Sequence, residues 1–135
     1  MSNPESDIHA ALMARAQVVE AALPYPFLWP QNGGDLPEAE HIRVSYVPND
    51  NVPLDLCSDV MDRKGFLYLT LVSHLGQYEV VTRRKAGEIA AYFRRGQRLQ
   101  QNSTKVTITG HTVRPGRQEG GRWETPIRIS YWSMA

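Results

Sequence analysis

The side chains that could hold a metal or carry catalysis are scattered along this chain. The four histidines are each isolated in sequence from one another and from acids: His9, His41, His74 and His111. A zinc site needs ligands at short spacings, such as two histidines four residues apart on a helix. No pair of these histidines has such a spacing. The pattern therefore predicts surface or sheet-edge histidines and no metal site.

Motifs for nucleophilic catalysis and phosphate binding are missing from the sequence as well. The single cysteine, Cys57, has no motif around it and excludes an intrachain disulfide. No Gly-x-Ser-x-Gly elbow occurs. The glycine pairs at 33–34 and 120–121 do not form a Gly-rich loop between a strand and a helix. Asp59 and Asp62 are three residues apart in an acidic turn, where solvated acids are usual. We therefore expect no enzyme, no cofactor and no catalytic residue.

Charge is sorted by sequence position, although the net charge is only +1. Residues 1–62 hold ten acids and two bases, whereas residues 63–135 hold four acids and thirteen Lys or Arg. Such asymmetry concerns partners rather than fold. It indicates either a nucleic-acid face or two complementary surfaces through which copies of the chain meet. Unlike patches on one chain suit a head-to-tail contact, which closes into a ring if the rotation allows.

Size and composition indicate one globular domain spanning residues 1–135. The chain has 135 residues, of which 41% are hydrophobic and 21% charged. No stretch approaches the roughly 18 uninterrupted apolar residues of a membrane span, and residues 1–20 do not resemble a secretory signal. We therefore expect no membrane partner and a protein made in the cytoplasm.

Two helices are predicted to position the charges. Apolar residues recur at spacings of three and four from Ile8 to Leu23, and Asn3 followed by Pro4 suits a helix start. A second helix is predicted from Tyr78 to Arg95, with Gly96 placed to cap its C-terminus.

The strands are predicted from short runs that either alternate apolar with polar residues or are apolar throughout. The strongest is 65–73, which is apolar on both faces and therefore belongs in the middle of a sheet with something packed over each side. Further strands are predicted at 41–47, 105–113 and 122–132, with a short one at 52–57. The fold class we expect is α+β, a mostly antiparallel sheet of four to five strands packed with two helices and ending in a C-terminal β-hairpin.

Two groups of side chains are candidate interface residues. Phe27 and Trp29 lie in the proline-rich segment 24–30, an extended arm or edge segment, and either cover the core of their own domain or dock on a neighbouring subunit. The second group consists of arginines on the second helix and the final hairpin: Arg83, Arg84, Arg94, Arg95, Arg114, Arg117 and Arg122. On the helix, pairs eleven residues apart are close to three turns apart and form two rows beside the apolar stripe. These arginines are either a solvated face or a binding surface.

Nucleic-acid binding lacks a motif in this sequence. There is no helix-turn-helix spacing and no aromatic signature of an RNA-binding sheet. The net charge of +1 is also far from that of strongly basic domains that bind by counterion release.

Several segments, taken in their order along the chain, resemble a known family. They are 26–30, 41–48, 65–72, 86–93 and 120–127. Together they are similar to the small tail terminator proteins of long-tailed bacteriophages and prophages, over about Ala11 to Tyr131. Segment 55–59 departs from the more Gly-rich link expected there.

The resemblance implies a virion structural protein with no catalytic residue, metal or cofactor. It implies a ring, usually of six subunits, that caps the head-proximal end of the tail tube, stops tube polymerisation and joins the head. The partners would be other copies of the chain, the tail tube protein and a head-completion or neck protein, with DNA only as cargo passing through the lumen. Assembly would take place in the host cytoplasm. Another head–tail connector or neck protein is the alternative within this class, and a nucleic-acid-binding module is the alternative outside it.

Overall fold

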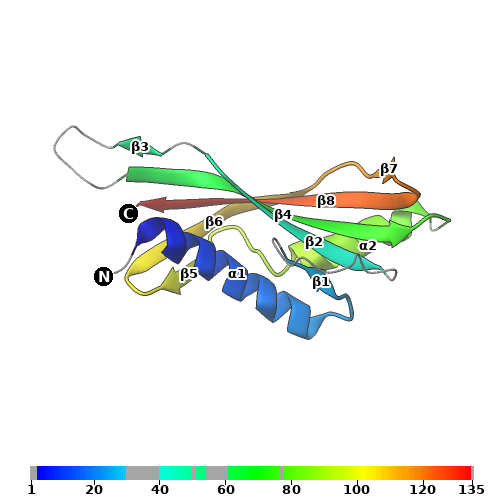
Figure 1. The fold of residues 1–135 in the computed structure, drawn as a ribbon, viewed down its shortest axis with the longest axis horizontal. Helices are drawn as coiled ribbons and strands as arrows, with labels where there is room; N and C mark the ends of the chain where they lie inside the picture. The colour runs from blue at the N-terminus through cyan, green and yellow to red at the C-terminus, as the bar shows by residue number, and fades with distance from the viewer. Residues whose placement is uncertain (1–2, 30–39, 50, 54–60, 77, 135) are drawn as a thin grey trace.

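The structure is a computed structural model that describes residues 3–29, 40–49, 51–53, 61–76 and 78–134. Within these ranges, two helices, α1 (Pro4–Ala22) and α2 (Glu79–Ala90), accompany one sheet of eight strands, and Figure 1 shows their arrangement. The strands are β1 (Phe27–Leu28), β2 (His41–Pro48), β3 (Val52–Pro53), β4 (Met61–His74), β5 (Arg98–Gln101), β6 (Thr104–Val113), β7 (Arg117–Glu119) and β8 (Arg122–Met134). The main order is β1-β2-β4-β8-β6-β5, with β3 paired to β4 and β7 to β8.

The α+β class, the two helices and the mostly antiparallel sheet are confirmed, but the predicted four to five strands are too few. Strand β1 pairs in parallel with β2, and every other pair is antiparallel. The strands that prediction missed, β1, β5 and β7, are two to four residues long. Such short segments carry too few residues for alternation to be recognised. The two strands of the expected C-terminal hairpin, β6 and β8, are neighbours in the sheet.

Helix α1 begins and ends where its sequence predicts. Asn3 caps it, since its Oδ1 accepts a hydrogen bond from the Glu5 N–H at 3.0 Å, and Pro4 occupies the first turn. The buried side is apolar: Ile8, Ala11, Leu12, Ala16 and Val19. Asp7 is buried beside these side chains and accepts hydrogen bonds from Asn102 at 2.9 Å and Thr104 at 3.1 Å. The acid therefore ties the start of α1 to the β5–β6 turn.

Helix α2 is shorter than the predicted 78–95, because the chain leaves the helix after Ala90. The carbonyl of Tyr92 accepts two hydrogen bonds from the Arg15 guanidinium, at 2.8 and 3.0 Å. Shortly after, the Gly96 N–H donates to the Ile108 carbonyl of β6 at 2.7 Å. These long-range bonds direct residues 91–97 toward the sheet.

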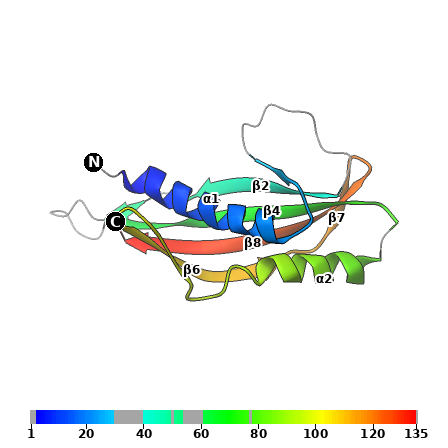
Figure 2. The same ribbon diagram turned by 90° about the horizontal axis from the view of Figure 1, so that it is seen from below.

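Strand β4 lies between β2 and β8, as predicted, with Leu67, Leu69 and Leu71 fully buried. Both helices cover this same face of the sheet, and their buried side chains join one hydrophobic core. Figure 2 shows α1 crossing the sheet and α2 lying along β6. The cover predicted over the second face of β4 is not found among the described residues. We call this second face the open face; it carries half-buried Phe66 and Tyr68.

Candidate assembly interface

An ion pair lies on the open face, toward the end of the sheet where β4 finishes and β2 and β8 begin. Arg43 of β2 donates two hydrogen bonds to the Glu124 carboxylate of β8, at 2.9 and 3.0 Å. Strand β4 lies between β2 and β8, so the ion pair links the two outer strands across the middle one. Arg117 of β7 reaches the same carboxylate at 3.9 Å. The Arg43 hydrogen bonds lower the pKa of Glu124, and they raise the pKa of Arg43.

Replacing Glu124 by glutamine is expected to lower the free energy of unfolding by about 1–2 kcal/mol at neutral pH, because charge-assisted hydrogen bonds are lost. The pKa of Glu124 is lower in the folded state than its ordinary value of 4.5. The stabilisation from Glu124 is therefore fully present above pH 4.5 and is lost as the pH falls through the folded-state pKa. Urea unfolding of both proteins between pH 3 and 7 tests this expectation (roughly the range over which acids titrate). A difference in stability that stays constant down to the lowest pH would contradict it.

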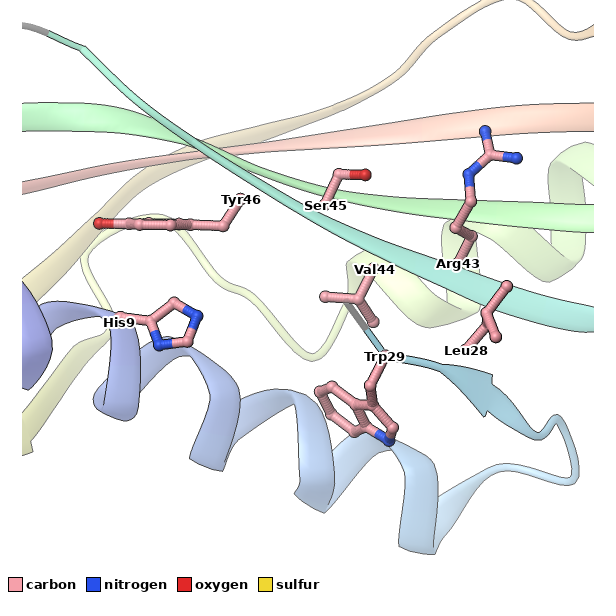
Figure 3. A pocket seen from close by; sticks show the side chains of 7 residues that line it. All are labelled: His9, Leu28, Trp29, Arg43, Val44, Ser45 and Tyr46. Carbon is pink, nitrogen blue, oxygen red and sulfur yellow. The ribbon is translucent and has the colours of Figure 1, made fainter. Parts of the chain in front are cut away.

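A groove lies between α1 and the outer edge of β2 (Figure 3). It measures about 520 Å³ and is lined by His9, Leu28, Trp29, Arg43, Val44, Ser45 and Tyr46. The His9 ring meets the Tyr46 ring edge-on, with centroids 5.1 Å apart. Trp29 packs on Phe27 and donates a hydrogen bond to Glu20 at 3.3 Å. The lining is therefore largely apolar and aromatic.

The edge of β2 presents backbone hydrogen-bonding groups to this groove. The Ile42 N–H donates outward to the Pro26 carbonyl at 3.0 Å, whereas the Asn49 N–H donates inward to Lys64 of β4 at 2.9 Å. Because backbone groups alternate in direction along a strand, the N–H and C=O groups of Val44 and Tyr46 also face outward. Strand β1 pairs with β2 at Ile42 and Arg43, and its hydrogen bonds reach as far as the Val44 N–H; no other described strand pairs with this edge, which leaves the Val44 carbonyl and both backbone groups of Tyr46 uncovered.

The two aromatic candidates have different places. Phe27 lies in the hydrophobic core, 7% exposed, and so covers the core of its own chain. Trp29 is half-buried at the wall of the groove, where a partner could still reach it.

The structure separates the seven arginine candidates into three places. On α2, Arg83 donates long hydrogen bonds to the carbonyls of Val113 and Arg114, at 3.4 and 3.3 Å, and so joins the helix to β6. Arg84 of α2 and, beyond the helix end, Arg94 and Arg95 are exposed. The predicted eleven-residue rows are therefore not rows on one helix. On the open face, Arg114 and Arg117 line one hollow with the Arg43–Glu124 pair, and Arg122 lines another beside it.

The acids of the first half are not a free patch in the described part of the chain. Each described one contacts a residue of its own chain: Glu5 with Arg63 and Asn51, Asp7 with Asn102 and Thr104, Glu20 with Trp29, Glu40 with Lys85, and Asp62 with Lys64 and Trp132. The other five first-half acids lie outside the described residues: Asp35, Glu38, Asp50, Asp55 and Asp59.

Sequence reasoning missed Arg43, Glu124, His9 and Tyr46 as interface candidates. Arg43 and Glu124 are 81 residues apart, and only the pairing of β2, β4 and β8 brings them together. The one available signal was the polar alternation of Arg43 and Ser45 in an otherwise apolar strand. Within the described ranges, no helix is long and apolar enough to cross a membrane, and no group of His, Cys, Asp or Glu side chains is arranged to hold a metal.

Comparison with known proteins decides the family. The sequence model of the phage tail terminator protein matches residues 7–131, nearly the whole chain. The chain belongs to the phage tail terminator family. The resemblance predicted from its segments is thereby confirmed, and the terminator is a structural protein of a phage tail, located in the virion.

Solved structures agree on the fold of this terminator. One solved structure is 21% identical in sequence, with a TM-score of 0.74, over 93% of this chain and 92% of that one. Another is a chain of the virion of a native gene transfer agent (GTA) particle, 8% identical with a TM-score of 0.61, over the full length of both chains. No curated protein sequence matches the chain.

Proposed function

We propose that the protein forms a ring, of six copies, that caps the head-proximal end of the tail tube. There it stops tube polymerisation and offers the surface that joins the filled head. The family match over residues 7–131 carries this proposal. The tail tube protein and a head-completion or neck protein are the partners, and DNA passes through the lumen only as cargo. Assembly takes place in the host cytoplasm before the ring becomes part of the virion.

The structure supports self-association by unlike surfaces. The groove lies beside α1 and the β2 edge, whereas exposed Arg84, Arg94 and Arg95 lie on α2 and just after it. Different patches on one subunit form head-to-tail contacts, and such contacts close into rings when the rotation fits.

Elongating tail tubes provide the test of capping. Purified protein added to isolated tubes and free tube protein is expected to stop elongation, and negative-stain images are expected to show a ring at one tube end. Native mass spectrometry of the released cap should give six copies. Tubes that elongate unchanged in its presence would refute capping. Binding to a head portal without binding to tubes would favour the neck-protein alternative.

Exposed Arg84, Arg94 and Arg95 are the feature that a nucleic-acid-binding module would use. Binding of generic duplex DNA measured at several salt concentrations separates the two functions. A module neutralises phosphates and loses affinity steeply as salt rises. A terminator is expected to bind tubes while showing no measurable affinity for DNA at physiological salt.

A further inference from the structure

Three large apolar side chains are exposed at the corner between β4 and α2. Leu75 is 45% exposed, Tyr78 81% and Val80 73%. Glu79, between the last two, is also exposed, and its carboxylate has no partner among the described residues. We call Leu75, Tyr78, Glu79 and Val80 the knob. In Figures 1 and 2 this corner lies at one end of the molecule, where β4 turns into α2. A cluster of exposed apolar side chains is typical of an interaction site.

The groove between α1 and β2 has the complementary chemistry. Its walls are apolar and aromatic, and the outward Val44 carbonyl and the outward N–H and C=O groups of Tyr46 lack partners among the described strands. A tyrosine side chain suits such a place, because it combines a large apolar body with a hydroxyl that donates or accepts a hydrogen bond. None of the described residues that line the groove is an acid, so Glu79 of the knob would meet no like charge on its walls.

We propose that the knob of one copy docks in the groove of a second copy, with Tyr78 entering between α1 and the β2 edge. This inference rests on the proposed ring and names its joint. Knob and groove belong to different elements of one chain, so the contact is head-to-tail and leaves one knob and one groove free for further copies. A buried aromatic anchor of this kind carries most of the affinity at an interface.

Paired variants test the joint. Tyr78→Ala removes the anchor, and His9→Trp fills the groove from an exposed position on α1. Each variant alone is expected to need about tenfold or more protein to assemble, as for the loss of an interface anchor. A mixture of the two is expected to form heterodimers and nothing larger, because one intact knob meets one intact groove. Native mass spectrometry gives the number of copies in each assembly, and thermal unfolding shows whether each variant is folded.

Matched controls come from the same surfaces. Gln17→Trp adds the same bulk to an exposed position of α1 that does not line the groove, and it should assemble normally. Tyr78→Phe keeps the ring of the anchor without its hydroxyl and should retain most assembly. If thermal unfolding shows that a variant is not folded, benzoylphenylalanine is placed at position 78 of the otherwise wild-type chain instead. Its photocrosslinks are expected on peptides containing Trp29 or Tyr46 of another copy.

The outcomes separate this joint from the ring itself. Wild-type protein that forms no ring in solution or on tubes refutes the proposed function and the joint with it. Wild-type rings that persist with Tyr78→Ala and His9→Trp refute the joint alone. Crosslinks from position 78 that map to the tube protein, to a neck protein or to another part of a second copy also overturn it.

Discussion

Alanine in place of Gly65 is expected to destabilise the protein by about 3 kcal/mol or more, as overpacking of a well-packed core does. A Cβ at position 65 would lie 2.6 Å from the Tyr131 hydroxyl, 2.6 Å from the Val47 carbonyl oxygen and 2.8 Å from the Pro48 Cα. Two of these atoms are backbone of β2, so relief requires β2 and β4 to move apart. The third belongs to Tyr131, whose hydroxyl donates to the Tyr46 hydroxyl at 3.0 Å. Burial of the Tyr131 hydroxyl raises its pKa well above the ordinary value of 10, which is consistent with this crowding.

Urea unfolding of the purified Gly65→Ala variant measures this effect. Gly110→Ala is the matched control in the same sheet, because the nearest atom to its added Cβ is the Ser130 Oγ at an ordinary 3.7 Å. The control is expected to stay within about 0.5 kcal/mol of the wild type, as substitutions without a specific mechanism do. Equal stability of both variants would show that β2 and β4 adjust freely at Gly65.

Reversing Arg83, Arg84, Arg94 and Arg95 to glutamate is expected to abolish ring formation while leaving the monomer folded. Like charges placed across an interface cost several kcal/mol, whereas an exposed surface substitution changes stability by no more than about 0.5 kcal/mol. Reversal of Arg83 is expected to lower the stability of the monomer as well, because its guanidinium contacts two carbonyls at the end of β6. The sharper variant therefore reverses only Arg84, Arg94 and Arg95.

Native mass spectrometry and negative-stain images show whether the reversed variants still form rings. Lys105→Glu, an exposed reversal on β6, is the matched control for Arg84→Glu alone and should assemble normally. The described first-half acids already contact their own chain, so a first-half partner for these arginines would come from the acids at 35, 38, 50, 55 and 59, whereas a second-half partner would come from an exposed acid such as Glu79 or Glu88 of another copy. Normal rings from the triple variant would show that the arginines face solvent in the assembly.

Local sequence signals predicted the elements that carry a long repeat of the right period. Helix α1 combines a cap with an apolar stripe, β4 contains a long run that is apolar on both faces, and β8 is long enough for its alternation to be recognised. The same signals failed at the end of α2, because Ala91 to Arg95 continue a helical pattern while Arg15 and Ile108 bind the backbone of residues 92 and 96. Those contacts are tertiary and leave no local trace.

The sequence by itself determined the α+β class, the two helices, the main strands and the family, because these depend on local periodicity and on the order of segments along the chain. Only the tertiary structure decided which side chains meet. The Arg43–Glu124 pair depends on the register across three strands, in which a shift of one residue would turn either side chain to the other face. The groove depends on where α1 lies against the β2 edge, and the open face on both helices covering the same side of the sheet. Charge sorted along the sequence is therefore a poor guide to charge on the surface, since folding pairs Glu5, Glu40 and Asp62 with bases of the second half.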